Sequence, residues 1–358
     1  MTARRSQSKL GRAETGVAET NRMEGDVEIA DRFGLGSARL GRRRLFGRAA
    51  AVVALPAAVV AAGLPPARAA VSARQEPAAA TATADGGEVA TAEPKTGFVP
   101  VDGLELYYEI HGPADGAPLV LLHGAYGSTA MWAGFVPTLA ETRWVIVPEM
   151  QGHGHTADID RPLGFERMAD DVAGLLDHLE IARADVFGYS MGGQIALQVA
   201  IRHPERVRKL VVASAPAASA GWHPEVIETA SNITPELFAD TPITEEYERV
   251  APNPEGFPGL VAKLNELVGT AYAWPDEAIR AIAAPTMFVI GDSDGVPPAY
   301  AAVLFALRGG GVFGDMAGLP NARLAVLPGT THVGVIERAG WLLPMIEEFL
   351  QVPMPEGR

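Results

Sequence analysis

Short apolar runs alternate with amphipathic segments along residues 98–352. The central runs are uninterrupted and rich in Val, Ile and Leu, as is typical of strands that are covered on both faces. In residues 165–179, apolar side chains recur every three or four positions, which predicts a helix. This alternation indicates an α/β fold with a mostly parallel sheet and helices on both of its faces. The predicted strands are Phe98–Val101, Leu104–Ile110, Leu119–Leu122, Trp144–Val147, Asp185–Gly188, Leu210–Ala213, Met287–Ile290 and Leu324–Leu327.

Two parts of this region depart from the alternation. The two opening strands are joined by the short polar turn Asp102-Gly103, so we expect them to pair antiparallel. Residues 216–284 have helical patterns and many aromatic side chains, and the segment is too short for us to expect a domain of its own. Its place in the chain suits a small helical lid over a site at the strand ends.

Residues 1–73 have the layout of a secretory signal peptide with a long basic beginning. A basic run is followed by an Ala- and Val-rich apolar stretch and then by small residues typical of a cleavage site. These parts are Arg42–Gly47, Ala49–Leu64 and Ala67–Ala73. Within the basic run, Arg43-Arg44-x-Phe46 resembles the twin-arginine motif, whose transporter exports folded proteins. We therefore expect the twin-arginine export machinery as a partner, and a periplasmic or extracellular location.

Residues 74–97 are rich in Ala, Thr, Glu and Gly and have no apolar period, so they are predicted to form a flexible linker before a folded domain at 98–352. An uncleaved anchor or a disordered basic tail is the alternative to a signal peptide. The apolar stretch is short and weakly hydrophobic for an anchor. Either Met1 or Met23 fits the start of translation.

Composition excludes several classes of protein. The 358 residues are 48% hydrophobic and 20% charged, which is enough apolar material for a large core. No apolar run reaches the roughly 18 to 20 residues of a membrane-spanning helix, so we expect no membrane span in the mature protein. The chain has no cysteine, which excludes disulfides, thiolate metal sites and a cysteine nucleophile. Residues 74–358 carry 37 Asp and Glu against 17 Lys and Arg, and such an acidic body repels nucleic acid.

The clearest chemical motif is Gly188-Tyr189-Ser190-Met191-Gly192, which follows a predicted strand and opens a predicted helix. It matches the G-x-S-x-G nucleophile elbow, in which a tight turn strains the backbone of the serine and the flanking positions must be small. The helix N-terminus supplies N–H donors and a positive dipole end for a developing anion. Ser190 is therefore the predicted nucleophile, although the pattern by itself also fits an ordinary Gly-rich turn.

A serine nucleophile needs a histidine to accept its proton and a carboxylate to orient that histidine. Of the eight histidines, His332 follows a late predicted strand, and the carboxyl edge of the sheet would bring it near Ser190. Asp294 follows the strand before it, and the chain order Ser190, Asp294, His332 is the order that goes with this elbow. Asp292 is the rival acid, and its closeness to the strand favours a local turn-forming role.

An oxyanion hole needs two N–H donors aimed at the tetrahedral intermediate. One predicted donor is the N–H of Met191, directly after the nucleophile, and the other is that of Ala125, in the loop after an early strand. His123 lies in the same loop, where we expect it to brace the backbone rather than to act as a base. Tyr126 from this loop and Trp222 from the lid are predicted to bind the substrate.

Taken together, the motifs of residues 98–352 resemble those of the α/β-hydrolase superfamily. The matching pieces are Leu122-His123-Gly124, Gly152–Thr156, Gly188–Gly192, Gly291-x-x-Asp294 and Pro328-Gly329-x-x-His332. The resemblance implies an eight-stranded sheet, a Ser-His-Asp triad and hydrolysis without a cofactor. Two features depart from the pattern. Glu149 stands where many relatives have Asp, and the stretch between Asp294 and His332 is extended around residues 308–314.

We expect a serine hydrolase that acts on a small-molecule carboxylic ester or lactone through an acyl intermediate on Ser190. No metal is predicted, because His153 and His155 lie on a Gly-rich loop without carboxylates at ligand spacing. The same triad also fits a cofactor-free perhydrolase or haloperoxidase-like enzyme, and the fold also hosts receptors that bind ligands without catalysis. A serine nucleophile disfavours haloalkane dehalogenation and epoxide opening, which use a carboxylate at this position.

Overall fold

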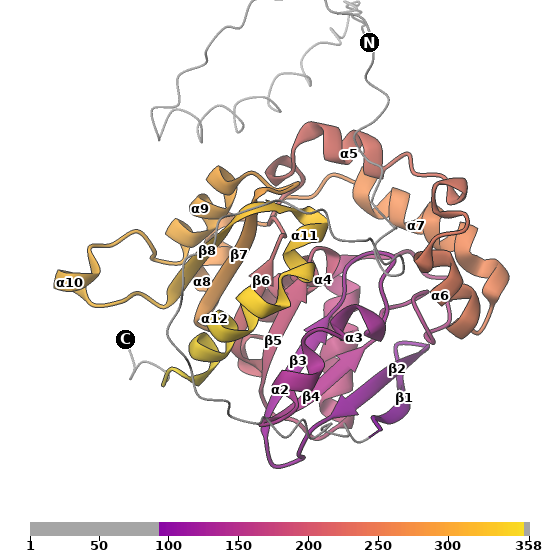
Figure 1. Cartoon of the computed structure of the whole chain (residues 1–358), viewed down its shortest axis with the longest axis horizontal. Coiled ribbons are helices and arrows are strands. Elements are labelled where there is room, and N and C mark those ends of the chain that lie inside the picture. The colour runs from indigo at the N-terminus through magenta and orange to yellow at the C-terminus, as the bar shows by residue number, and fades with distance from the viewer. Residues whose placement is uncertain (1–92, 354–358) are drawn as a thin grey trace, which may run out of the picture. The chain divides into compact units, whose positions relative to one another are not determined.

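The computed structural model describes residues 93–353 (Figure 1). The predicted signal peptide 1–73 and nearly all of the predicted linker lie outside the described residues. The described part contains an eight-stranded sheet with the strand order β1-β2-β4-β3-β5-β6-β7-β8. The strands are β1 (Lys95–Val101), β2 (Leu104–His111), β3 (Ala117–Leu122), β4 (Arg143–Pro148), β5 (Ala184–Tyr189), β6 (Val207–Ala213), β7 (Thr286–Ser293) and β8 (Ala322–Thr331).

The sheet is mostly parallel, which confirms the predicted α/β architecture. β1 pairs antiparallel with β2, and β2 pairs antiparallel with β4, whereas every other pairing is parallel. The two opening strands therefore form the predicted hairpin. In the parallel part, Leu122 lies beside Gly188, and Tyr189 lies beside Ala213. The carboxyl ends of β3, β5 and β6 thus meet at one edge, where the functional groups of such sheets gather.

Two strands extend beyond the apolar runs that predicted them. β1 begins at Lys95 rather than Phe98, because its pairing with β2 continues through polar residues and Lys95 lies opposite Ile110. β1 therefore begins three residues before the apolar run that predicted it. β8 continues to Thr331, which still pairs with Ser293 of β7. Backbone hydrogen bonds do not depend on apolar side chains, so hydropathy alone underestimates such strand ends.

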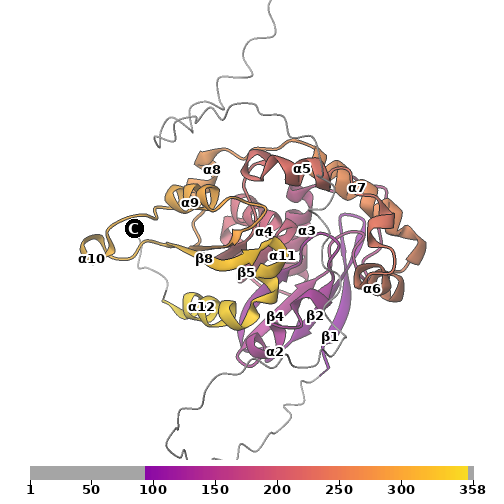
Figure 2. The same cartoon turned by 45° about the horizontal axis from the view of Figure 1, so that its top comes forward.

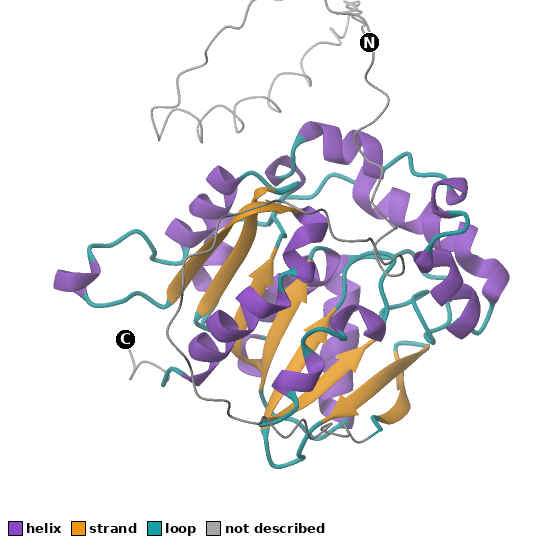
Figure 3. Ribbon diagram, in the orientation of Figure 1, coloured by secondary structure: helices purple, strands orange, loops and turns teal. Residues whose placement is uncertain are grey.

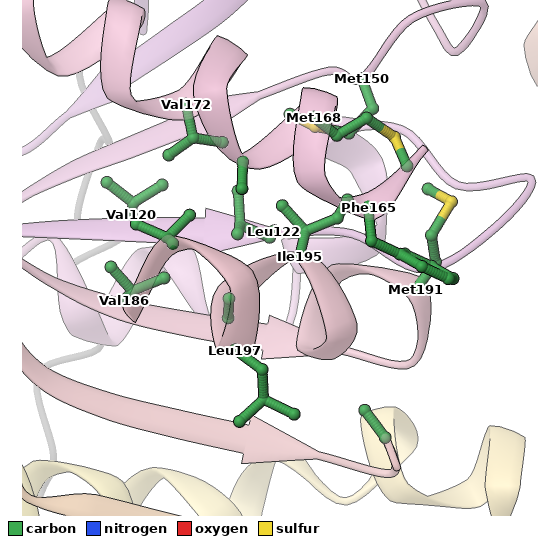
Figure 4. Close-up of a cluster of buried hydrophobic side chains, with 14 of the residues drawn as sticks. Val120, Leu122, Met150, Phe165, Met168, Val172, Val186, Met191, Ile195 and Leu197 are labelled. Atoms are coloured by element: carbon green, nitrogen blue, oxygen red, sulfur yellow. The ribbon is translucent and has the colours of Figure 1, made fainter. Parts of the chain in front are cut away.

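Helices cover both faces of the sheet, as predicted (Figure 3). In β3, Val120 and Leu122 face one apolar cluster, while Leu119 and Leu121 face the other. The first cluster contains side chains from α3 (Phe165–His178), α4 (Met191–Arg202), α8 (Asp276–Ala281) and α9 (Pro298–Leu307), and Figure 4 shows the part between α3, α4 and the sheet. The second contains side chains from η1 (Thr129–Trp132), α2 (Val136–Leu139), α11 (His332–Glu337) and α12 (Ala339–Gln351). No helix within residues 93–353 is both long and apolar enough to cross a bilayer.

Between β6 and β7 the chain is mostly helical, as predicted for residues 216–284. Figures 1 and 2 show α5 (Pro224–Ala230), α6 (Pro242–Val250) and α7 (Phe257–Gly269) beyond one end of the sheet. The helices of the whole segment are η3 (Ser219–Gly221), α5, η4 (Pro235–Phe238), α6, η5 (Pro254–Gly256), α7 and α8. Two short helices lie elsewhere in the described chain, η2 (Pro204–Arg206) before β6 and α10 (Gly314–Ala317) before β8. The rings of Phe238 and Tyr247 both pack on the ring of Phe257, so these three aromatic residues form the core of the segment.

Polar contacts attach this helical segment to the rest of the domain. Lys263 Nζ of α7 lies 2.8 Å from the carboxylate of Asp158, in the loop before α3. The indole N–H of Trp274 donates a hydrogen bond of 3.0 Å to Glu166 of α3. These contacts hold the helical segment against α3 and the loop that precedes it.

Candidate active site

Ser190 lies at the sharp turn between β5 and α4. Its backbone has a φ of 54° and a ψ of −121°, a conformation that strains any residue with a side chain. The turn also requires the glycines on either side of it. A Cβ on Gly188 would come within 2.0 Å of Gly192 O, and a Cβ on Gly192 would come within 2.0 Å of Leu122 O. The backbone around Ser190 therefore has the geometry that the elbow motif describes.

The ring of His332 connects Ser190 to Asp294. Its Nε2 lies 3.0 Å from Ser190 Oγ, and its Nδ1 lies 2.7 Å from Asp294 Oδ1. His332 is the first residue of α11, directly after β8, and Asp294 directly follows β7. The carboxyl ends of β5, β7 and β8 thus bring together the three residues that the sequence singles out. In this arrangement the imidazole can accept the serine proton while it donates its other N–H to the carboxylate.

The carboxylate of Asp294 is buried and well supplied with donors. Ser214 Oγ donates a hydrogen bond of 2.6 Å to Oδ2, and the N–H of Val296 donates one of 3.2 Å to Oδ1. Burial opposes the charge, but the hydrogen bonds from His332, Ser214 and the backbone outweigh it and hold the pKa of Asp294 below its usual value. The sequence does not single out Ser214. The one feature that could have pointed to it is its position directly after β6.

Asp292 has a different role from its neighbour Asp294. Its Oδ2 accepts a hydrogen bond of 2.8 Å from the N–H of Gly329, and its Oδ1 accepts one of 3.1 Å from the N–H of Thr330. These bonds join β7 to the segment just before His332. The expected local turn-forming role is therefore wrong for Asp292, because Asp294 makes the turn-type bond to the N–H two residues later.

The two residues whose N–H groups are predicted to form the oxyanion hole, Ala125 and Met191, both line the pocket that contains Ser190. Ala125 lies in the loop after β3, and Met191 is the first residue of α4. Within residues 93–353, neither N–H donates a hydrogen bond to a protein acceptor. Both are therefore free to bind an oxygen atom of a substrate.

His123 is buried beneath the loop that carries Ala125. Its Nδ1 donates a hydrogen bond of 2.8 Å to Gly124 O, and its Nε2 accepts one of 3.0 Å from the N–H of Met150. Burial lowers the pKa of His123, so the ring stays neutral and keeps one donor and one acceptor. These contacts agree with the expected bracing role.

His153 holds the next residue of the same loop. Its Nε2 accepts a hydrogen bond of 3.2 Å from the N–H of Tyr126, and its Nδ1 donates one of 3.0 Å to Gln151 O. Burial and the neighbouring His123 lower the pKa of His153 to about 3. Both ring nitrogens are engaged, and in the described part of the chain no group of three or more His, Cys, Asp or Glu side chains is placed to hold a metal ion.

Glu149, the residue that departs from the family pattern, is fully buried. Its Oε1 accepts a hydrogen bond of 2.9 Å from the N–H of Thr129, in η1. Its Oε2 accepts one of 2.5 Å from the N–H of His155, and the ring Nδ1 of His155 lies 3.0 Å from the same oxygen. The carboxylate thus joins the chain after β3 to the loop after β4. The longer acid at this position spans two loops and does not contact Ser190, Asp294 or His332.

A cavity of about 320 Å³ opens onto Ser190 and His332. Tyr126 and Trp222, the two predicted substrate-binding residues, both line it, and the ring centroid of Trp222 lies 5.5 Å from that of His332. Most of the other wall is aliphatic and comes from the helical segment 216–284, including Val226, Ile227, Ile233, Ile243, Leu264 and Leu267. The segment therefore forms the predicted cover over the strand ends.

Two polar residues of the cavity wall belong to no motif of the sequence. Gln194 lies on α4, four residues after Ser190, and its side-chain N–H donates a hydrogen bond to the hydroxyl of Tyr272. The position of Gln194 one helical turn from the nucleophile is the only sequence signal for it. Tyr272 has no fixed spacing from the nucleophile, and its signal is that it is one of the aromatic residues of the helical segment between β6 and β7.

Comparison with known proteins places this arrangement in a family. Residues 117–244 match a family model described as the alpha/beta hydrolase fold. The proposed carbamate hydrolase RutD of Variovorax paradoxus is 31% identical over 215 residues, which cover 54% of this chain and 80% of that protein. The 2-hydroxymuconate semialdehyde hydrolase of Pseudomonas sp. strain CF600 is 29% identical over 262 residues, which cover 67% of this chain and 89% of that protein.

A solved structure shares the fold. The enol-lactonase from Burkholderia xenovorans LB400 is similar with a TM-score of 0.55 and 24% identity, over 71% of this chain and 100% of that chain. The relatives that align along most of their length are hydrolases by name. The matching family model, these relatives and the shared fold lead to one conclusion, that the chain belongs to the α/β-hydrolase family.

Proposed function

We propose that the protein is an exported serine hydrolase that cleaves a carboxylic ester or a lactone through an acyl intermediate on Ser190. The observation that carries this proposal is the position of the His332 ring between Ser190 Oγ and the Asp294 carboxylate. A serine hydroxyl with such a partner can lose its proton as it attacks a carbonyl carbon. The strained backbone of Ser190 and its exposure to the cavity support the same role.

In the proposed reaction, Ser190 Oγ attacks the carbonyl carbon while His332 Nε2 accepts the hydroxyl proton. The negative charge that develops on the carbonyl oxygen is stabilised by the N–H groups of Ala125 and Met191 and by the positive end of α4. His332 then donates the proton to the leaving alcohol oxygen, which leaves the acyl group on Ser190. Throughout this step, Asp294 stabilises the protonated ring of His332 and fixes its orientation.

The second half of the reaction repeats these roles with water. A water molecule attacks the acyl carbon and gives a proton to His332, and the charge again develops between the N–H groups of Ala125 and Met191. His332 returns the proton to Ser190 Oγ as the acyl bond breaks. The acid is released and the serine hydroxyl is restored. With a lactone, the released acid and alcohol belong to one molecule.

The cavity supports an ester or a lactone rather than an anionic substrate. Among residues 93–353, no Asp, Glu, Lys or Arg lines it, so a charged substrate group would lose its hydration without gaining a counterion from them. The muconate in the name of one relative is a carboxylate, and the described residues that line this cavity include neither Lys nor Arg to bind it. Neutral esters and lactones avoid this cost.

Export is proposed from residues 1–73 alone, on the basis of the Arg43-Arg44 pair before a short apolar stretch. Fractionation of cells that produce the full chain tests it. We expect the native sequence in the exported fraction, and the variant with Arg43→Lys and Arg44→Lys inside the cells. Equal export of both sequences would contradict a twin-arginine route.

Labelling of the full chain with a fluorophosphonate probe tests the catalytic proposal, because the probe reacts with activated serines whatever the substrate. We expect the adduct on Ser190, located by peptide mass spectrometry. Labelling should be lost in Ser190→Ala and in His332→Ala. Ser231→Ala is the control, because the Ser231 hydroxyl bonds back to its own helix at Ile227 O and should leave labelling unchanged.

A folded native protein that stays unlabelled would contradict the mechanism and would favour ligand binding without catalysis. Labelling on Ser190 that persists in His332→Ala would contradict the role of the histidine. Circular dichroism of each variant separates loss of reactivity from loss of fold. Once labelling is established, a screen of ester and lactone hydrolysis tests the substrate class.

A further inference from the structure

Gln194 is a buried polar residue in a cavity wall that is otherwise mostly apolar. Its side chain is 4% exposed and lines the cavity beside Ser190. The backbone fixes its place, because the N–H of Gln194 donates a hydrogen bond of 3.1 Å to Ser190 O. The side-chain amide therefore sits one helical turn from the reacting hydroxyl.

The nitrogen of this amide has a protein partner, whereas its oxygen does not. Gln194 Nε2 donates to the hydroxyl of Tyr272, and that hydroxyl lies 3.5 Å from Pro216 O, to which it can donate in turn. Within residues 93–353, no donor hydrogen-bonds to Gln194 Oε1, and this oxygen is open to the cavity. Because this acceptor lies in a mostly apolar cavity wall and has no protein donor, a ligand that supplies a donor there gains affinity.

The hydrogen bonds run from Gln194 Nε2 to the Tyr272 hydroxyl and from that hydroxyl to Pro216 O. This direction determines which kind of ligand group can bind Gln194 Oε1. Tyr272 is held in place by its ring contacts with Phe165 and Trp274, whose centroids lie 5.1 Å and 5.0 Å away. Nε2 uses one of its two N–H groups on Tyr272, and the amide oxygen, on the other side of the group, presents an acceptor to the cavity. The group that fits it is an O–H or N–H donor, and the apolar walls exclude a charged one.

We propose that Gln194 is a specificity-determining residue that accepts a hydrogen bond from a hydroxyl group on an uncharged, otherwise apolar ester or lactone. This inference rests on the proposed function, because it assigns the substrate class of the same site. Gln194 takes no part in the bond-making steps. It distinguishes a hydroxylated substrate chain from the corresponding plain chain.

The test compares matched pairs of neutral aliphatic esters that differ only in one hydroxyl group. One series carries the hydroxyl along the acyl chain, and the other carries it on the alcohol part. We expect the native protein to prefer a hydroxylated member of at least one series by about tenfold in kcat/KM, the effect of one buried hydrogen bond. Gln194→Leu should remove the preference while it retains hydrolysis of the plain ester.

Two controls separate this role from a structural one. Gln194→Met is a second apolar variant for the case in which leucine prevents folding. Tyr247→Phe removes a hydroxyl from the helical segment 216–284, at a residue that does not line the cavity, and should leave the preference in place. The absence of a preference in both series would overturn the proposal. So would a preference that survives in the Gln194 variants, or an equal loss of activity on both members of a pair.

A binding measurement keeps the two proposals distinguishable. Aliphatic ketones with and without a hydroxyl are titrated calorimetrically into Ser190→Ala protein, in which no acyl transfer occurs. We expect about tenfold tighter binding of the hydroxylated ketone, and no such difference when Gln194→Leu is added. Failure of fluorophosphonate labelling contradicts the proposed function alone. Equal binding of both ketones contradicts the role of Gln194 alone.

Discussion

Ser214 Oγ donates a hydrogen bond of 2.6 Å to Asp294 Oδ2, the carboxyl oxygen opposite the one that faces His332. The two residues follow the neighbouring strands β6 and β7. With both oxygens engaged, the plane of the carboxylate is fixed, and with it the direction of its bond to His332. The same hydrogen bond favours the charged form and contributes to the lowered pKa of Asp294. We infer that Ser214 positions the proposed triad.

Removal of the Ser214 hydroxyl is therefore expected to lower catalysis without removing a reacting group. Ser214 has a φ of 54°, a value that glycine adopts without strain, so Ser214→Gly loses the hydroxyl at no cost to the backbone conformation. We expect kcat on an ester substrate to fall by about tenfold, the effect of one hydrogen bond to a charged group.

Ser214→Ala is the matched variant, because it loses the same hydroxyl but keeps the backbone strain. Equal losses of kcat in both variants would assign the effect to the hydroxyl. A loss in Ser214→Ala that is absent from Ser214→Gly would assign it to the backbone and contradict the positioning role.

The residues Ser190, Asp294 and His332 are predictable from sequence because each follows an apolar strand. Parallel strands place such residues at one edge of the sheet, whatever their separation along the chain. The strands themselves are predictable because both faces are covered, so that each reads as an uninterrupted apolar run. The motif, the predicted strands and their parallel order all place these three residues at the carboxyl edge of the sheet.

The supporting residues escape sequence analysis because single polar side chains have no period and no fixed spacing. Ser214 and Gln194 matter through partners 80 and 78 residues away, which only the folded chain brings near. Asp292 shows the opposite error. A local turn is the simplest interpretation of an aspartate after a predicted strand. Its actual partners, Gly329 and Thr330, lie on the neighbouring strand β8.

Relief of the strain at Ser190 is expected to stabilise the protein while it abolishes the proposed activity. A φ of 54° with a ψ of −121° costs about 1 to 3 kcal/mol for a residue with a Cβ, and glycine avoids that cost. Compared with Ser190→Ala, which loses the same hydrogen bond to His332, Ser190→Gly should have a free energy of unfolding higher by about 1 kcal/mol, after the greater flexibility of unfolded glycine is subtracted.

Urea unfolding measures this change, and Ser190→Ala is its control. Alanine also loses the hydroxyl but keeps the strained backbone, so it should be less stable than the glycine variant. Equal stability of the two variants would show that the turn at Ser190 stores no strain.

Shortening Glu149 is expected to weaken the connection between two loops. In the present structure its two oxygens accept hydrogen bonds from the N–H groups of Thr129 and His155 at 2.9 Å and 2.5 Å. The shorter side chain of Glu149→Asp cannot reach both donors from the same backbone position. We expect the free energy of unfolding to fall by about 1 to 3 kcal/mol, because the buried carboxylate loses one of its hydrogen-bond donors. Chemical denaturation checks this, with Glu205→Asp on the exposed surface as a control that should change little.

His153 is expected to make the protein less stable in acid. Its pKa is lowered to about 3 in the folded protein by burial and by His123, whereas in the unfolded chain it is near 6.5. Between these values the unfolded chain binds more protons, so the stability from neutral His153 is fully present above pH 6.5 and is lost as the pH falls. From pH 7 to pH 5, this group should lower the free energy of unfolding by about 2 kcal/mol.

His153→Gln tests this origin of the pH dependence, because a glutamine amide can accept the hydrogen bond from the N–H of Tyr126 and does not titrate. The fall in stability between pH 7 and pH 5, measured by urea unfolding, should be about 2 kcal/mol smaller in the variant. Some fall should remain, because burial also lowers the pKa of His123. The exposed His178 provides the control, since His178→Gln keeps the buried ring and should fall as the native protein does. If His153→Gln showed the full native fall in stability, the acid sensitivity would have to come from other groups.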